Sequence, residues 1–220
     1  MYQLLPFMIK LSEKTKLKEQ FEADIHGLYL VDGTPFLGKA TDFEKSFTDD
    51  FSGKGPWALG NNESFEGKIE NGHYYLNQKL VNRVFYSYVP MAIKADKNWA
   101  IEASIEALST KEGNGFGLVL GKNQESDGGS VFFINPLEKR FWIAHHNGKD
   151  WYDEINGHLF RLMDEKTNIL RVENLEGHWQ FFINSYLVYI CPTQALYGDA
   201  FGFAFHGQAT IQADYFKIQW

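Results

Sequence analysis

From residue 46 onward, apolar and polar side chains alternate with the period expected of β-strands. In the clearest run, one face carries Trp99, Ile101, Ala103, Ile105 and Ala107, and the other carries Asn98, Glu102, Ser104 and Glu106. Successive side chains of a strand point to opposite faces of its sheet. This run therefore predicts a strand with one buried and one solvent-facing side.

Further short strands are predicted at residues 74–78, 84–89, 116–120, 131–134, 140–145, 169–174, 179–183, 201–205 and 211–220. Turn signals separate them at residues 70–72, 112–115, 126–129, 146–148, 156–157 and 176–177. This spacing predicts an antiparallel sandwich or barrel. Strands do not alternate with helices, which excludes a Rossmann or TIM-barrel fold.

The first 45 residues follow a different pattern. Ser12 is suited to cap a helix, Leu17, Phe21 and Ile25 recur at i+4 spacing, and Gly27 stands where a C-terminal cap belongs. They predict a helix over residues 11–26. We therefore divide the chain into an N-terminal extension, residues 1–45, and an all-β sandwich, residues 46–220.

Composition narrows the function classes. Hydrophobic residues make up 44% of the chain, enough for a large core, and the net charge of −7 without a basic stripe excludes a general nucleic-acid binder. No apolar run reaches the length of about 20 residues that a membrane span needs. The start lacks the basic segment and cleavage site of a signal peptide, so we expect a cytoplasmic chain or a longer precursor.

The tetrapeptide Phe-Phe-Ile-Asn occurs twice, at residues 132–135 and 181–184. The flanking sequences share only a glycine turn, so the two copies are not a repeated domain. Each copy reads as a strand that runs into a turn, with asparagine suited to the turn.

Four stretches from residue 47 onward resemble the concanavalin A-like lectin/glucanase superfamily. The nearest likeness is to laminin-G-like jelly-roll domains of bacterial carbohydrate-related proteins, including 3-keto-disaccharide hydrolase-like ones. The stretches are residues 47–51 with Trp57, residues 115–121, residues 179–184, where Ser185 replaces the usual glycine, and residues 201–203 with 211–218. The resemblance implies two packed antiparallel sheets with a concave face that often binds glycans. It covers both glycosidases and modules without catalysis, and its motifs specify architecture rather than activity.

No convincing catalytic group is present. Glycoside hydrolysis needs two carboxyl groups about 5–9.5 Å apart, whereas Glu102 and Glu106 on one strand stand about 13 Å apart. Neighbours such as Asp153 and Glu154 diverge on an extended segment. Cys191 is a buried small hydrophobe, and His145 and His146 point to opposite faces of a strand, which disfavours joint zinc ligation.

Asp214 is the candidate metal ligand. Alternation along the last strand places it on the face of Phe216, Ile218 and Trp220, where a carboxylate needs hydrogen-bond partners or a cation. Backbone N–H groups are the favoured partners. The resemblance implies the alternative, a structural calcium ion shared with Asp50.

Two aromatic sets are candidate ligand sites. Arg140, Trp142 and His146 share one strand face, opposite the core members Phe141 and Ile143, and the next turn supplies Trp151 and Tyr152. The second set is Tyr86 and Tyr88, with Arg83 before them. Sugars stack on exposed aromatics that have polar groups around them.

The sequence thus predicts a jelly-roll sandwich that binds carbohydrate on its concave sheet without catalysis. The alternatives are a glycoside hydrolase with carboxylates from loops, and a structural accessory domain in which the aromatics are buried.

Overall fold

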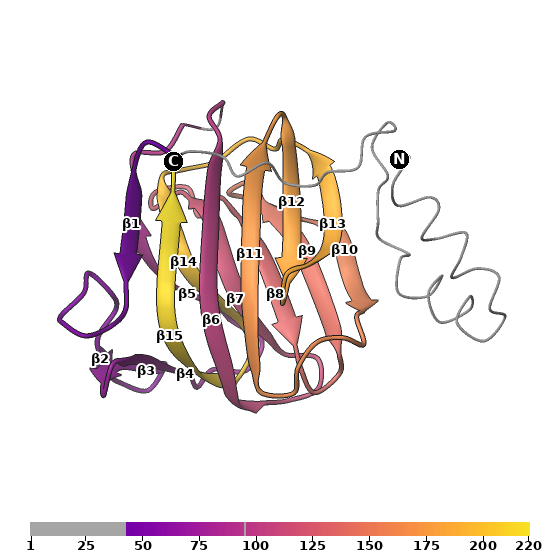
Figure 1. Ribbon diagram of the computed structural model, residues 1–220. Coiled ribbons are helices and arrows are strands. Elements are labelled where there is room, and N and C mark those ends of the chain that lie inside the picture. The colour runs from indigo at the N-terminus through magenta and orange to yellow at the C-terminus, as the bar shows by residue number, and fades with distance from the viewer. Residues whose placement is uncertain (1–42, 95) are drawn as a thin grey trace, which may run out of the picture.

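Two antiparallel sheets pack face to face in the computed structural model, which describes residues 43–94 and 96–220 (Figure 1). The larger sheet runs β13-β12-β11-β6-β15-β4-β3-β2, with β1 also paired to β15. Its strands are β1 (Ser46–Asp49), β2 (Gly60–Asn61), β3 (Phe65–Glu70), β4 (His73–Gln78), β6 (Trp99–Thr110), β11 (Thr167–Leu175), β12 (His178–Ile183), β13 (Tyr186–Pro192) and β15 (Ala209–Gln219).

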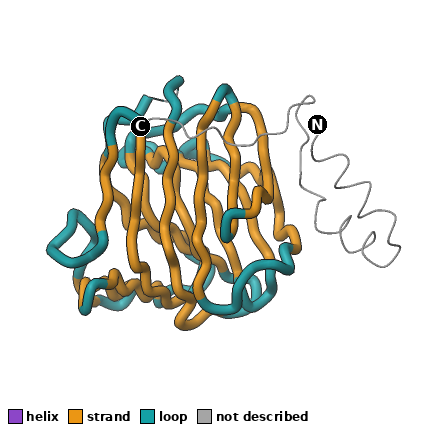
Figure 2. Tube along the Cα trace, in the orientation of Figure 1, coloured by secondary structure: helices purple, strands orange, loops and turns teal. Residues whose placement is uncertain are grey.

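The smaller sheet runs β10-β9-β8-β7-β14-β5. Its strands are β5 (Val84–Pro90), β7 (Gly115–Lys122), β8 (Gly129–Asn135), β9 (Arg140–His146), β10 (Trp151–Leu159) and β14 (Ala200–His206). Figure 2 shows strands joined by loops throughout the described residues. In that part of the chain no helix has the length and apolar character to cross a bilayer. The predicted antiparallel jelly-roll sandwich is confirmed, and the helix predicted over residues 11–26 lies outside the described residues.

The core between the sheets is aromatic. At one end Trp99 contacts Trp179 and Phe201 edge-on, with ring centroids 5.5 and 5.7 Å apart. At the other end Trp57 packs on Tyr74 and other rings, and its indole N–H donates to the Asp49 carboxylate at 2.8 Å. Such rings bury about 150–250 Å² each, so they supply much of the hydrophobic stabilisation.

The two Phe-Phe-Ile-Asn copies lie in opposite sheets, one in β8 and one in β12. Phe132 and Phe181 meet across the core, with ring centroids 5.3 Å apart. The side-chain oxygen of Asn135 accepts from the backbone N–H groups of Leu137 and Glu138, which confirms its role in the turn. The second copy ends in the Asn184-Ser185 turn, where both residues have positive φ.

Two sequence predictions fail in detail. The turn predicted at residues 156–157 is an irregularity inside β10, where the register with β9 shifts between Ile155 and His158. The predicted strands also lack β2, β3, β10 and β13. These strands lie at or next to the sheet edges, where β-bulges and weak alternation are common.

Candidate functional site

A hollow of about 420 Å³ opens on the outer face of the smaller sheet, away from the core. All six strands of this sheet contribute to it, together with the segment before β5 and the turn between β6 and β7. The described residues that line it are Asn82, Val84, Gly113, Asn114, Gly115, Phe133, Trp142, Ala144, Trp151, Asp153, Asn156 and His206. Its volume is within the range of small-molecule sites, about 300–1,000 Å³.

The floor of the hollow is a small apolar cluster on the outer face of the sheet. The buried members of this cluster are Val119, Val131, Phe133, Ala144 and Ala204, of which Phe133 and Ala144 line the hollow. Phe133 on β8 pairs directly with Trp142 on β9, and the half-buried Trp142 packs against the cluster. Because Ala144 is small, the floor is recessed between the larger side chains of Trp142 and Trp151.

The backbone of β10 closes one side of the floor. Gly157 has a φ of +65°, and a Cβ there would lie 3.1 Å from Nε1 of Trp142. Arg140 donates a hydrogen bond to the Gly157 carbonyl, which ties β10 to β9 at the irregular part of their pairing. The glycine therefore lets the β10 backbone lie against the indole ring.

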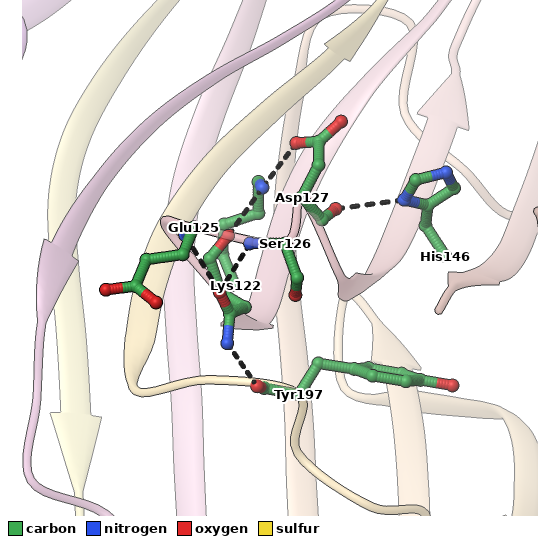
Figure 3. A network of polar contacts seen from close by, with 7 residues as sticks. Lys122, Glu125, Ser126, Asp127, His146 and Tyr197 are labelled. Carbon is green, nitrogen blue, oxygen red and sulfur yellow. Dashed lines mark hydrogen bonds and ion pairs between the residues drawn. The ribbon is translucent and has the colours of Figure 1, made fainter. Parts of the chain in front are cut away.

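Trp151 forms an exposed wall of the hollow, with 42% of its surface accessible. Its ring centroid lies 4.9 Å from that of His146. Nδ1 of His146 donates to the Asp127 carbonyl oxygen at 2.9 Å, which holds the imidazole in place (Figure 3). The ring of Trp151 thus rests on a fixed neighbour.

Asp127, whose carbonyl holds His146, also forms an ion pair with the buried Lys122 at the end of β7, shown in Figure 3. Nζ of Lys122 donates to the Asp127 carboxylate at 2.5 Å and to the Asn123 carbonyl at 2.8 Å. It also lies 5.0 Å from the centroid of the Tyr86 ring. Burial raises the pKa of Tyr86, and the negative charge of Asp127 raises it further, so this phenol stays protonated.

Solved structures with the same arrangement of strands include proteins of two kinds. The chain is similar to the laminarinase from Flavobacterium sp. UMI-01, with 13% identity over 79% of this chain and 99% of that chain and a TM-score of 0.54. It is also similar to the CBM2 module of the evolved Dit of Lactobacillus casei BL23 phage J-1, with 13% identity, 80% and 96% covered, and a TM-score of 0.54. The laminarinase catalytic domain from Thermotoga maritima MSB8 shares 11% identity over 81% and 98% of the chains, with a TM-score of 0.51.

The chain has a concanavalin A-like jelly-roll fold. No protein-family profile and no curated protein matches its sequence. Identities of 11–13% establish a shared fold and leave activity to be argued from the site itself.

The structure places two of the predicted ligand residues, Trp142 and Trp151, in the hollow of this jelly roll. His146 lies behind Trp151, and Arg140 is bonded to the β10 backbone. The hydroxyl of the exposed Tyr152 accepts a hydrogen bond from Asn147 at 2.9 Å.

The three residues of the second predicted ligand set have different surroundings. Tyr86 and Tyr88 pack against the apolar cluster of the outer face, whereas Arg83 is exposed just before β5. None of the three is among the residues that line the hollow. As ligand residues they stay a prediction.

Sequence reasoning missed His206, Asn114 and Phe133 as lining residues. They come from β14, the β6–β7 turn and β8, which are far apart in the sequence and meet only through the order of strands in the sheet. The glycines at positions 113 and 115 around Asn114 were the one local signal, because they let the backbone approach closely.

The face predicted for Asp214 is wrong. The pairing of β15 with β6 shifts between Ala213 and Tyr215, so Asp214 is an extra residue and turns to the outer face. There its carboxylate accepts from Ser104 Oγ at 2.8 Å and lies 3.0 Å from Nδ1 of His73.

Asp50 has other partners. Its exposed carboxylate accepts from the Ser52 backbone N–H at 3.1 Å, and bonds from Ser52 lower its pKa. Among residues 43–94 and 96–220 no group of three or more His, Cys, Asp or Glu side chains is arranged to hold a metal ion. Calcium binding by Asp50 and Asp214 stays a prediction.

The remaining candidate side chains lie away from the hollow. Glu102 is on the outer face of the larger sheet, where it bonds to Arg171 and Tyr215. His145 points into the core and hydrogen-bonds to Ser130 at 2.8 Å. Burial, with a contribution from Glu154, raises the pKa of the Cys191 thiol to about 12, so it stays protonated and unreactive.

Proposed function

We propose that this chain is a carbohydrate-binding module whose ligand occupies the hollow on the smaller sheet. The observation that carries the proposal is the pairing of a recessed Trp142 with the exposed Trp151, surrounded by amide, carboxylate and imidazole groups. Sugar rings have apolar faces that stack on aromatic rings and hydroxyl groups that bond to planar polar side chains. The hollow offers both in one place.

Binding without hydrolysis fits the charges of the site. Asp153 is the one carboxyl group among the described residues that line the hollow. Glycoside hydrolysis uses two carboxyl groups about 5–9.5 Å apart, one as acid and one as base or nucleophile. The fold also occurs in a module named for carbohydrate binding as well as in laminarinases, so it is compatible with either role.

The accessory-domain alternative requires the aromatics to be buried. Trp151 and Tyr152 are 42% and 52% exposed, and the hollow is open beside Trp151. An exposed tryptophan at the wall of a recessed apolar floor is typical of a ligand site. We therefore favour glycan binding over a purely structural role.

The test is a glycan-array screen of the full chain, followed by calorimetry on the best glycan. Trp142→Ala and Trp151→Ala are each expected to weaken binding by about tenfold or more, because each removes a stacking surface. Tyr186→Ala is the control, since Tyr186 is an exposed aromatic residue, at 52% against 42% for Trp151, but lies on β13 of the larger sheet.

Thermal unfolding of each variant separates loss of binding from loss of fold. The proposal is overturned if the wild-type chain binds no glycan, or if Tyr186→Ala reduces binding as much as the two tryptophan variants do. Release of new reducing ends from the bound glycan would instead support the glycoside hydrolase alternative.

A further inference from the structure

The hollow holds no free positive charge, although its surroundings contain several basic residues. None of the described residues that line it is a lysine or an arginine, and the histidine among them, His206, is at the end of β14. The one formally charged lining group is the carboxylate of Asp153. An acidic ligand would therefore meet a like charge without a cation to offset it.

Three basic side chains near the hollow are already engaged, and the exposed Arg83 before β5 is not among the residues that line it. The Lys122 side chain is only 4% exposed and is neutralised by Asp127, as Figure 3 shows. Arg140 donates to the Gly157 carbonyl, and Nζ of Lys111, beside the β6–β7 turn, donates to the Gln208 amide oxygen at 2.6 Å. Recruiting any of them for a ligand would break an existing interaction.

Asp153, in contrast to these basic side chains, has no ion-pair partner among the described residues. It is exposed on β10, opposite Ala144 of the floor. A carboxylate accepts hydrogen bonds from sugar hydroxyl groups and repels carboxylate or sulfate groups. It is the group that sets the electrostatic preference of the hollow.

We propose that the hollow selects glycans without acidic groups and discriminates against uronic-acid and sulfated units. The inference rests on the proposed function, since it names the chemical class of sugar that the same site takes. Neutral hexose units fit the combination of stacking rings, amides and one acceptor carboxylate. An acidic unit would carry its charge into an acidic, cation-free recess.

The experiment is a glycan array in which neutral oligosaccharides stand beside their sulfated or uronic-acid counterparts, read at 150 mM and 1 M NaCl. At 150 mM NaCl we expect the acidic glycan to bind at least about tenfold more weakly than its neutral counterpart. The difference should shrink at 1 M, because the screening length falls from about 8 to about 3 Å.

Variants at Asp153 assign the discrimination to the hollow. Asp153→Asn is expected to narrow the gap between neutral and acidic glycans, and Asp153→Lys to close or reverse it. Glu106→Lys makes the same change of charge on the outer face of the larger sheet, and it is expected to leave the gap as it is.

The outcomes distinguish the two proposals. If the wild-type chain binds acidic counterparts as tightly as neutral glycans at 150 mM NaCl, the inference fails and the glycan-binding function stands. If Asp153→Lys and Glu106→Lys shift the gap equally, the preference comes from the overall net charge and its assignment to the hollow fails. If no glycan binds at all, the proposed function itself is lost.

Discussion

Side chains alternate between inner and outer faces in both sheets, but the two outer faces differ in how their polar and charged side chains are paired. On the larger sheet, Arg171 lies between two carboxylates, with Nε 2.5 Å from Glu173 and a terminal nitrogen 3.2 Å from Glu102. The Tyr215 hydroxyl donates to Glu102 at 2.8 Å. On the smaller sheet, the corresponding positions hold an apolar cluster and a hollow whose rim groups lack such pairing.

On the larger sheet the charged side chains pair with one another, whereas the smaller sheet presents side chains that a ligand can contact. Burial raises the pKa of Tyr215, and the negative charge of Glu102 adds to the shift, so the phenol remains a donor within its own network. In this network each of the two carboxylates is paired with the same cation. On the smaller sheet, the exposed ring of Trp151 can stack on a ligand, and the carboxylate of Asp153 can accept hydrogen bonds from it.

Filling the hollow should have the largest effect. Ala144→Leu adds bulk to the floor between Trp142 and Asp153, so we expect glycan binding to fall by about a hundredfold or more, equivalent to about 2.8 kcal/mol. Calorimetry measures the loss, and thermal unfolding shows that the fold persists. Ser109→Leu, at an exposed position on β6 of the larger sheet, is the control. Equal losses in both variants would remove the distinction between the two faces.

Breaking the charged network should affect stability and leave binding alone. Arg171→Met leaves Glu102 and Glu173 without their cation on a partly buried surface, so we expect the free energy of unfolding to fall by about 2 kcal/mol. Urea unfolding measures it. Adding Glu102→Gln and Glu173→Gln to the same variant should recover part of the loss. A tenfold drop in glycan affinity for Arg171→Met alone would mean that the larger sheet takes part in binding.

Sequence reasoning succeeded where alternation is unbroken. It placed Phe141 and Ile143 in the core and Trp142 on the outer face, and the structure agrees. It failed at irregularities such as Asp214, because one extra residue in a strand breaks the alternation between the side chains before it and those after it. A single residue inserted into a strand leaves no mark on composition or propensity.

The sequence predicts only some of the residues of the candidate site, for a different reason. Trp142 and Trp151 lie on neighbouring strands joined by one turn, so local sequence brings them together. Asn82, Asn114 and His206 reach the same hollow from distant parts of the chain, through the pairing of β14 with both β5 and β7. That strand order follows from long-range packing, which alternation does not encode.

His145, on the inner side of β9, should make the stability of the protein depend on pH. Burial lowers its pKa, and Glu154 opposes the shift. Above about pH 6.5 the imidazole is neutral in both the folded and the unfolded chain. As pH falls below that value, the unfolded chain takes up a proton that the folded protein resists, so stability decreases.

The loss of stability at His145 should be steepest at no more than about 1.4 kcal/mol per pH unit. Urea unfolding at pH 7.5 and 5.5 measures it, and His145→Gln should reduce the difference between the two values. His178→Gln, at the first residue of β12 in the larger sheet, should keep the difference. A wild-type chain that gains stability on acidification over this interval contradicts the assignment.

Two glycines with positive φ provide the finest comparison of the faces. Gly157 on β10 and Gly177 between β11 and β12 have φ values of +65° and +80°, so alanine at either position should cost about 1 kcal/mol in urea unfolding. A Cβ at residue 177 meets no atom within 4 Å, whereas one at residue 157 presses on the Trp142 indole. We therefore expect Gly157→Ala alone to weaken glycan binding as well, by a few-fold, because the displaced ring presents its face less well. Equal affinities for the two variants would show that the backbone of β10 does not set the position of Trp142.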